Sequence, residues 1–162
     1  MNPSDISSAL KDAGLEIRTC MQCGTCSGSC PSGRYTSMIT RRIVRKAGAG
    51  RDILHDDDLW MCTTCYTCQE RCPRGIKITD AILMIRTIAV HEGIMLPEHR
   101  KVSQLVLQYG HAVPINDSVK EKREKLGMEP LPETVHKYPD ALADVQTLLK
   151  SCGFDKLAGS EG

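Results

Sequence analysis

Aromatic residues are scarce in this chain of 162 residues, which contains one Trp, one Phe and four Tyr. Aromatic side chains supply much of the buried area of a typical core, so we expect a modest hydrophobic core. The sequence also lacks a G-x-G-x-x-G dinucleotide loop and a P-loop. No nucleophile with a matching base stands out either. These absences argue against nucleotide binding, and no residue is predicted to be catalytic.

Long apolar runs are missing as well. A membrane-spanning helix needs about 20 apolar residues, whereas the strongest run, from Ile82 to Ile85, stops at Arg86. The first residues, Met1 to Asp5, have neither the basic start nor the apolar stretch of a signal peptide. The net charge of +1 is close to balanced, which does not favour nucleic acid as a partner. We therefore expect a cytoplasmic protein that binds neither membrane nor nucleic acid.

Cysteine, by contrast, is abundant. Eight of the nine cysteines form two copies of the pattern C-x2-C-x2-C-x3-C-P, the first from Cys20 to Pro31 and the second from Cys62 to Pro73. Three thiolates spaced three residues apart can hold one four-iron cluster from a single loop, and in two-cluster ferredoxins the fourth cysteine, followed by proline, ligates the other cluster. The repeat of 42 residues between the copies therefore predicts two 4Fe–4S clusters.

The predicted ligands are shared crosswise between the two motifs. The first cluster is assigned to Cys20, Cys23, Cys26 and Cys72. The second cluster is assigned to Cys62, Cys65, Cys68 and Cys30. The ninth cysteine, Cys152, lies outside both motifs and is predicted to be a free thiol.

Three other uses of cysteine fit the pattern less well. Structural zinc is usually held by two separated C-x2-C pairs, and plant-type 2Fe–2S proteins use C-x4-C-x2-C. A disulfide framework is typical of secreted proteins, for which the sequence shows no export signal. The cysteines indicate a reducing compartment.

The segments between and after the motifs carry apolar residues at helical spacing, and few read as strand. Thr79 is interpreted as the N-cap of its helix, and the run Asp56 to Asp58 as a cap for a turn before Trp60. Ile39 is taken as part of the apolar stripe of the first helix. Helices are predicted over residues 36–47, 79–91, 97–109, 119–126 and 140–151, with a shorter helix or turn over 52–59.

We therefore predict an all-α protein, an alpha-helical ferredoxin with two 4Fe–4S clusters and a helical C-terminal extension. Residues 1–95 are assigned to the helical two-cluster ferredoxin domain and residues 96–162 to the extension. The extension is longer than a free electron carrier needs. It either packs onto the domain or docks onto a larger subunit.

Three other local features carry information about function or packing. Four basic residues, Arg41, Arg42, Arg45 and Lys46, form either a solvated helix face or a docking surface for an acidic partner. Gly24 in the first motif corresponds to Tyr66 in the second. We interpret Gly24 as allowing a close approach of backbone to cluster, and the difference as a sign that the two clusters have different environments. Trp60 is predicted to pack in the core.

The second motif with its flanks, from Asp58 to Gly75, closely resembles the C subunit of heterodisulfide reductase from methanogenic archaea. The narrowest part of the match is the run Leu-Trp-x-Cys-Thr-Thr-Cys-Tyr-x-Cys, which starts at Leu59. The first motif, followed by Gly33-Arg34-Tyr35, and the basic helix after it also fit. The resemblance covers residues 15–95, whereas the remainder is similar only in length and helical character.

The resemblance implies an electron-relay subunit of an oxidoreductase complex that is not catalytic on its own. In that family, the flavin-bearing A subunit bifurcates electrons. The C subunit passes them through two 4Fe–4S clusters to the B subunit, which reduces the heterodisulfide of coenzyme M and coenzyme B in methanogenesis. A nickel–iron hydrogenase is the implied electron source in the larger complex.

Three alternatives remain at this point. The iron–sulfur subunit of succinate and fumarate enzymes carries a preceding 2Fe–2S domain, for which the 19 residues before Cys20 leave no room. An equivalent relay subunit could serve another heterodisulfide-reductase-like complex, for example in sulfur oxidation. A redox-sensing or zinc-binding module is the alternative from a different class.

Overall fold

The structure is a computed structural model that describes residues 3–159, and these residues form helices, turns and loops without any strand. The all-α prediction is confirmed. The chain divides into two compact units, the first ending at Ile94 and the second beginning at Met95. Among the described residues, no helix is long and apolar enough to cross a membrane.

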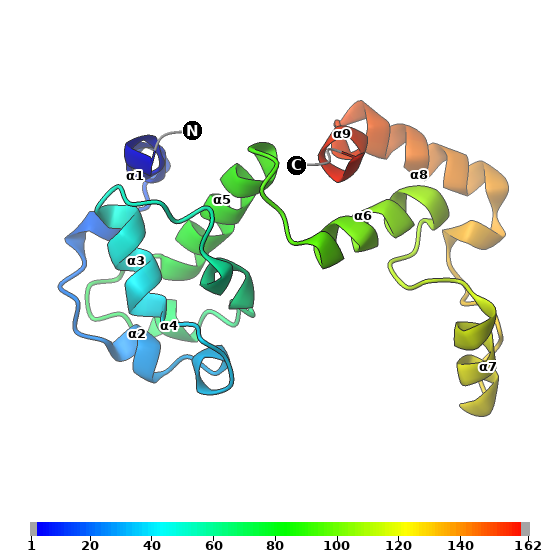
Figure 1. The fold of residues 1–162 in the computed structure, drawn as a ribbon, viewed down its shortest axis with the longest axis horizontal. Coiled ribbons are helices and arrows are strands. Elements are labelled where there is room, and N and C mark those ends of the chain that lie inside the picture. The colour runs from blue at the N-terminus through cyan, green and yellow to red at the C-terminus, as the bar shows by residue number, and fades with distance from the viewer. Residues whose placement is uncertain (1–2, 160–162) are drawn as a thin grey trace. The chain divides into compact units, whose positions relative to one another are not determined.

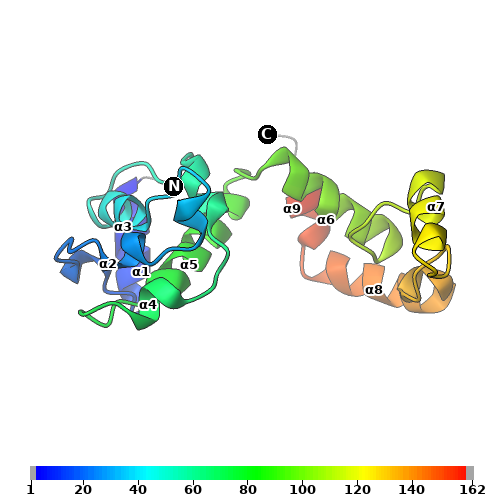
Figure 2. The ribbon, with the colours of Figure 1, turned by 90° about the horizontal axis from the view of Figure 1, so that it is seen from below.

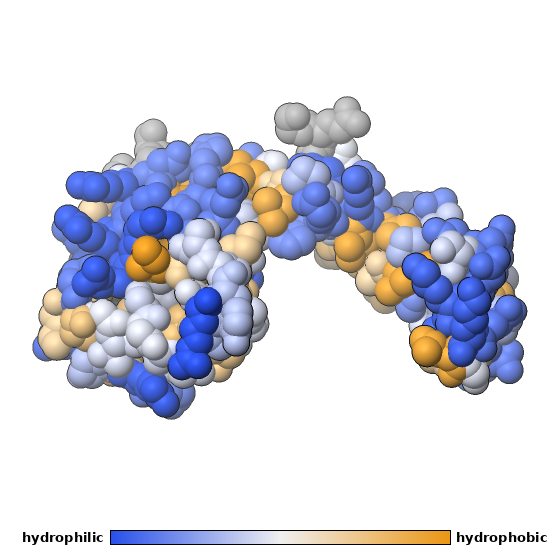
Figure 3. All heavy atoms as spheres, turned by 60° about the horizontal axis from the view of Figure 1, so that its bottom comes forward, coloured by the Kyte–Doolittle hydropathy of each residue, from blue (hydrophilic) through white to orange (hydrophobic). Residues whose placement is uncertain are grey.

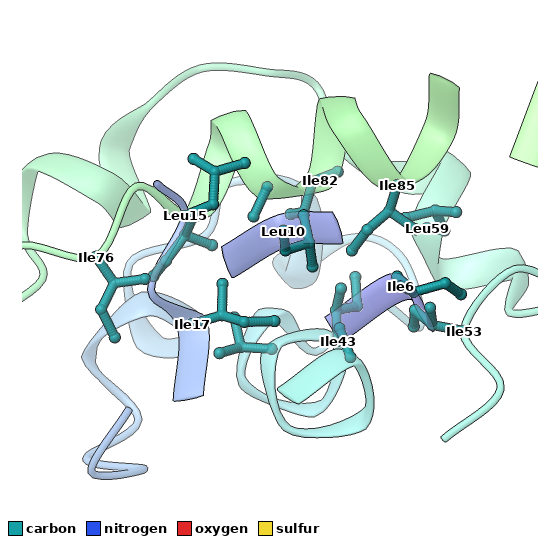
Figure 4. Close-up of a cluster of buried hydrophobic side chains, with 14 of the residues drawn as sticks. Ile6, Leu10, Leu15, Ile17, Ile43, Ile53, Leu59, Ile76, Ile82 and Ile85 are labelled. Atoms are coloured by element: carbon teal, nitrogen blue, oxygen red, sulfur yellow. The ribbon is translucent and has the colours of Figure 1, made fainter. Parts of the chain in front are cut away.

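Helix α1 packs against both α3 and α5 in the first unit. Its side chains Ile6 and Leu10 lie between Ile43 of α3 and the pair Ile82 and Ile85 of α5 (Figure 4). The α-helices of this unit are α1 (Pro3–Asp12), α2 (Thr25–Gly28), α3 (Thr40–Gly48), α4 (Thr67–Glu70) and α5 (Ile78–His91) (Figure 1). Short 3-10 helices span Ile17–Thr19, Ser32–Arg34 and Asp57–Met61. The sequence did not predict α1, although its two core residues stand four positions apart, as on one helix face.

Helix α3 begins at Thr40 and not at Thr36 as predicted. Ile39 has extended backbone angles and is 41% exposed, so its assignment to the apolar stripe was wrong. The residues before it form a turn, in which the hydroxyl of Thr36 accepts a hydrogen bond from Met38 N at 3.2 Å. This turn buries Met38 instead.

Helix α5 begins at Ile78, and the prediction of Thr79 as its N-cap was wrong. Lys77 is the N-cap residue, without a side-chain capping bond. The first-turn N–H groups are satisfied from another segment, because Gln69 Oε1 accepts from Thr79 N at 3.1 Å and from Asp80 N at 3.5 Å. Thr79 itself is fully buried inside the helix.

The aspartate run before Trp60 caps a turn, as predicted. Residues 52–56 form no helix, and a 3-10 helix spans Asp57–Met61. Asp56 is its N-cap and accepts a hydrogen bond from Asp58 N at 3.1 Å. Trp60 is half-buried and packs against the core, which confirms its predicted role.

The second unit is a smaller helical assembly in which α6, α8 and α9 lie side by side (Figure 2). Its α-helices are α6 (Pro97–Tyr109), α7 (Asp117–Lys125), α8 (Pro139–Ser151) and α9 (Phe154–Gly159), and a 3-10 helix spans Val135–Lys137. Helix α7 starts two residues earlier than predicted, because Asn116 caps it by accepting from Val119 N at 2.9 Å. Helix α9 was not predicted.

The two units differ in how much apolar surface they bury. In the first unit, one continuous core joins the helices and the cysteine loops. Among the described residues of the second unit, only Ala158 is fully buried. Its apolar side chains are otherwise half-buried or exposed, Leu126 at 73% and Leu148 at 67%. Figure 3 shows orange apolar atoms among the blue polar surface of this unit.

Candidate metal centres

The two cysteine motifs fold into loops with the same backbone conformation. Gln22 and Thr64 occupy the left-handed region at φ 59° and 52°, as do Gly24 at 86° and Tyr66 at 63°. A short helix follows each loop, α2 after the first and α4 after the second. The sequence repeat is therefore also a structural repeat.

Gly24 is explained by this conformation. A Cβ atom there would lie 3.8 Å from its nearest neighbour, Arg41 Nη1, an ordinary contact distance. Its positive φ favours glycine, whereas Tyr66 adopts the same region at a cost of about 1–2 kcal/mol. The second loop is therefore more strained than the first.

The structure brings the eight motif cysteines together as two sets of four. One pocket is lined by Cys20, Cys23, Cys26 and Cys72. The other is lined by Cys30, Cys62, Cys65 and Cys68. We call these the first and second cysteine pockets. Each contains three cysteines of one motif and the last cysteine of the other. Cys152 is exposed and lines neither pocket.

Backbone N–H groups point at cysteine sulfurs in both pockets. Three such groups donate to the sulfurs, and two of them occupy equivalent places in the two loops. The bonds are Gln22 N to Cys20 Sγ, Thr64 N to Cys62 Sγ and Gly33 N to Cys30 Sγ, each 3.4 Å long. Hydrogen bonds of this kind stabilise negative charge on thiolate sulfur.

In each loop, a threonine hydroxyl lowers the pKa of the exposed cysteine. Thr25 Oγ1 lies 3.4 Å from Cys23 Sγ, and its hydrogen bond lowers the pKa of that exposed thiol. Thr67 Oγ1 lies 3.5 Å from Cys65 Sγ and lowers the pKa of that thiol in the same way. Both thiols are therefore predisposed to the thiolate form that metals bind.

For the buried cysteine of each loop, the pKa shifts in the opposite direction. Burial raises the pKa of Cys26 and of Cys68, so these thiolates need a positive partner. Thr79 Oγ1 lies 3.5 Å from Cys68 Sγ and opposes the effect of burial there. A metal cluster supplies the required positive charge.

Arg86 ties helix α5 to the second loop, a role that the sequence did not reveal. Its Nε donates to Leu59 O at 2.9 Å and its Nη2 to Cys62 O at 2.8 Å. The guanidinium also lies over the Trp60 ring, 5.7 Å from the centroid. Burial lowers the pKa of Arg86. The one available signal was its position as a charged residue within an apolar helix.

The basic cluster on α3 is divided between two roles. Arg42 forms an ion pair with buried Asp58, and Lys46 forms one with Asp56, so these two bases hold α3 to the segment before the second loop. Arg41 and Arg45 are exposed. The cluster is therefore partly structural, and Arg41 and Arg45 remain available to a partner.

The residues of both pockets fit an iron–sulfur cluster. Each pocket presents four cysteine sulfurs that can ligate metal. At least one of these sulfurs accepts a hydrogen bond from a backbone N–H group. Apolar side chains complete the lining, Ile76 and Ile78 in the first pocket and Met38 in the second. A largely apolar surround with N–H donors is the environment that tunes such clusters.

Comparisons with known proteins agree with this chemistry. Residues 16–76 match the family model described as 4Fe-4S dicluster domain. The chain is 61% identical over 153 residues to the C subunit of the Ferredoxin:CoB-CoM heterodisulfide reductase of Methanosarcina mazei, covering 94% of this chain and 95% of the relative. It is 52% identical over 147 residues to the iron-sulfur C subunit of the CoB--CoM heterodisulfide reductase of Methanopyrus kandleri, covering 90% and 77%.

A third relative is the C subunit of the H(2):CoB-CoM heterodisulfide,ferredoxin reductase of Methanothermobacter marburgensis, 49% identical over 158 residues, covering 96% of this chain and 85% of the relative. The prediction of two 4Fe–4S clusters is confirmed. With such relatives over most of its length, the chain belongs to the family of heterodisulfide reductase C subunits, the iron–sulfur electron-transfer subunits of an oxidoreductase complex.

Proposed function

We propose that this chain relays electrons within a heterodisulfide reductase complex, from the flavin-bearing A subunit to the B subunit that reduces the heterodisulfide of coenzyme M and coenzyme B. The observation that carries the proposal is the pair of four-cysteine pockets within one small unit. The relatives' names supply the substrate class, because each names a CoB–CoM heterodisulfide reductase. They do not favour the sulfur-oxidation alternative.

The ligand assignment is part of the proposal. Cys20, Cys23, Cys26 and Cys72 hold one cluster, and Cys62, Cys65, Cys68 and Cys30 hold the other. The lining of the two pockets supports this arrangement. When bound, a 4Fe–4S cluster takes up and releases single electrons. The chain's own residues supply thiolates, N–H donors to sulfur and an apolar surround.

Docking to the larger subunits is assigned to the second unit. Its apolar side chains are poorly buried, and exposed apolar surface is the kind that subunit interfaces cover. We assign residues 96–162 to this docking role. Arg41 and Arg45 on the first unit remain available for an acidic partner surface.

The electron donor has two candidates. A nickel–iron hydrogenase would supply electrons from H2, the donor in the name of the Methanothermobacter marburgensis relative. The Methanosarcina mazei relative is more similar, at 61% against 49% identity, and is named for ferredoxin. This difference favours reduced ferredoxin as the donor.

The test is to isolate the native complex anaerobically by a tag on this chain and to assay heterodisulfide reduction. We expect co-purification of a flavin protein and a second iron–sulfur protein, with activity from reduced ferredoxin. A Cys23→Ser/Cys65→Ser chain, which loses one ligand from each pocket, should abolish turnover by the assembled complex. Cys152→Ala is the matched control and should leave turnover unchanged.

Two results would contradict the relay. One is heterodisulfide reduction by the isolated chain, and the other is full turnover by a complex whose copy of this chain holds no iron. Turnover with H2 and not with ferredoxin would reassign the donor to hydrogenase.

A further inference from the structure

The two cysteine pockets are related by a second repeat, formed by the segments that lead from each cysteine–proline pair into the next long helix. The segment into α3 contributes Met38 and Thr40 to the second pocket. The segment into α5 contributes Ile76 and Ile78 to the first pocket. In both cases the second of the two residues is the first of its helix. Thr40 is therefore the structural counterpart of Ile78. The second pocket has a hydroxyl-bearing side chain at the place where the first pocket has an alkyl side chain.

The Thr40 hydroxyl is buried without a partner. The residue is 0% exposed, and within residues 3–159 its Oγ1 has no hydrogen-bond partner. Leaving a buried donor unsatisfied costs about 1–3 kcal/mol, so such a group needs an explanation.

Helix geometry does not supply the missing partner. A threonine inside a helix commonly donates to the carbonyl four residues earlier, as Thr87 does to Leu83 O at 3.1 Å. Thr40 is the first residue of α3, and the residue four positions before it, Thr36, lies in the preceding turn. Thr40 also lines the second cysteine pocket, so a group bound there is the candidate acceptor.

We propose that the Thr40 hydroxyl donates a hydrogen bond to a sulfur of the cluster held in the second cysteine pocket, and that this bond raises the reduction potential of that cluster. The proposal rests on the proposed ligation. Cluster and thiolate sulfurs gain negative charge on reduction, so a donor to sulfur stabilises the reduced form more than the oxidised form.

A comparison of the side-chain donors in the two pockets shows that the Thr40 hydroxyl distinguishes the second pocket from the first. In the second pocket the Thr79 hydroxyl is already within 3.5 Å of Cys68 Sγ. In the first pocket a different side chain has this role, because Gln22 Nε2 donates to Cys20 Sγ at 3.2 Å. The side chain of Ile78 has no hydrogen-bond donor, so the Thr40 bond is confined to one of the two clusters.

The experiment is an anaerobic redox titration of the full chain, followed by electron paramagnetic resonance of the two clusters. Thr40→Val replaces the hydroxyl by a methyl group of similar size, and Thr40→Ser keeps the hydroxyl. Ser7→Ala is the matched control, because the Ser7 hydroxyl is also buried and, within residues 3–159, unpartnered, yet it lines neither pocket. Substitution of Cys65 identifies which signal belongs to the second pocket.

We expect Thr40→Val to lower the midpoint potential of the second-pocket cluster and to leave the other unchanged. Thr40→Ser should stay near the original value, and Ser7→Ala should shift neither cluster. A Thr40→Val chain that holds about eight iron atoms, as two four-iron clusters require, with both potentials unmoved would overturn the proposal.

Iron content separates this proposal from the proposed function. An unsubstituted chain with fewer than two four-iron clusters would contradict the ligation itself. If Thr40→Val and Thr40→Ala both fail to hold the second-pocket cluster while Thr40→Ser holds it, the hydroxyl is required there, as proposed. Loss of that cluster in Thr40→Ser as well would assign the role of Thr40 to methyl packing and overturn the hydrogen bond.

Discussion

At the scale of single residues, Cys72 and Cys30 have the most distinctive positions, since each lines the pocket of the opposite motif. We expect Cys72→Ser to remove or alter the first-pocket cluster, with a loss of up to about half the iron. Cys30→Ser should do the same to the second. Iron analysis and electron paramagnetic resonance would measure this, with Cys152→Ala as the control that keeps both signals. Loss of the Cys62-containing cluster in Cys72→Ser, with the other intact, would contradict the crosswise assignment.

The ionisation of Asp58 leads to a prediction of how the stability of the fold depends on pH. Burial alone would raise its pKa, but hydrogen bonds from Ser37, at 2.6 Å, and from Arg42 bring the pKa below its usual value. Because the folded pKa is depressed, the ionised carboxylate stabilises the fold above its unfolded pKa of about 3.9. That stabilisation is lost as the pH falls through the lower folded value.

We therefore expect Asp58→Asn to lower the free energy of unfolding by about 1–3 kcal/mol at neutral pH. The difference from the unsubstituted chain should shrink below pH about 4. Anaerobic denaturant titrations at several pH values would measure it. The exposed neighbour Asp57 provides the control, since Asp57→Asn removes the same charge without these bonds. Equal effects of the two substitutions would show that the buried contacts of Asp58 contribute nothing.

At the scale of elements, the 3-10 helix Ser32–Arg34 packs at Gly33 against the segment into α3 and against Cys30 of the second pocket. A Cβ atom on Gly33 would lie 2.7 Å from Met38 O, a backbone atom, and 3.6 Å from Cys30 Cβ. We expect Gly33→Ala to displace Cys30 and to destabilise the first unit by about 1–3 kcal/mol. Iron loss from the second-pocket cluster and thermal unfolding would report the displacement.

Gly28→Ala is the matched control for that substitution. Gly28 ends helix α2, and a Cβ atom there would meet nothing within 4 Å. This change should be neutral or slightly stabilising. If Gly33→Ala left both iron content and stability unchanged, the turn would be free to shift without moving its cysteine.

The elements that the sequence predicted best are those whose ends are set by their own residues. Helix α6 matches its prediction at both ends, because Pro97 is its first residue and Gly110 follows its last in a left-handed conformation. Helix α5 was less well predicted, because its first turn is capped by Gln69 from a separate segment. The local pattern around Thr79 carries no sign of that partner.

In the candidate site too, the sequence predicted the features that depend on local residues and missed those that depend on distant segments. Cysteine spacing alone predicted the two sets of four, since the ligand pattern is local and repeated. Thr40, Asp58 and Arg86 were not predicted, because their roles depend on which loops approach them in space. Thr40 in particular has no distinguishing neighbour in the sequence, and its position opposite the second loop becomes visible only in the fold.

At the scale of the whole molecule, the two units are expected to differ in local stability. The first unit has one continuous core, whereas the described part of the second buries only Ala158 completely. Few buried contacts mean low local opening free energy. We expect the amides of α6, α7 and α8 to exchange with solvent deuterium faster than those of α3 and α5 in the isolated holo-chain.

Binding of the larger subunits should then slow exchange in the second unit selectively. Hydrogen exchange of the free chain and of the tagged complex, compared by mass spectrometry, would measure both effects. Equal protection of the two units in the free chain would contradict the stability difference. Unchanged exchange of α6 to α8 in the complex would place the docking surface elsewhere.

The crosswise lining of the pockets also has a consequence for damage by air. Under the proposed ligation, neither pocket is complete until both loops are in place, and losing one cluster frees a cysteine loop that the other depends on. Oxidative attack on either pocket therefore also loosens the segment that carries the fourth ligand of the other pocket, so that damage at one cluster exposes its neighbour to later loss.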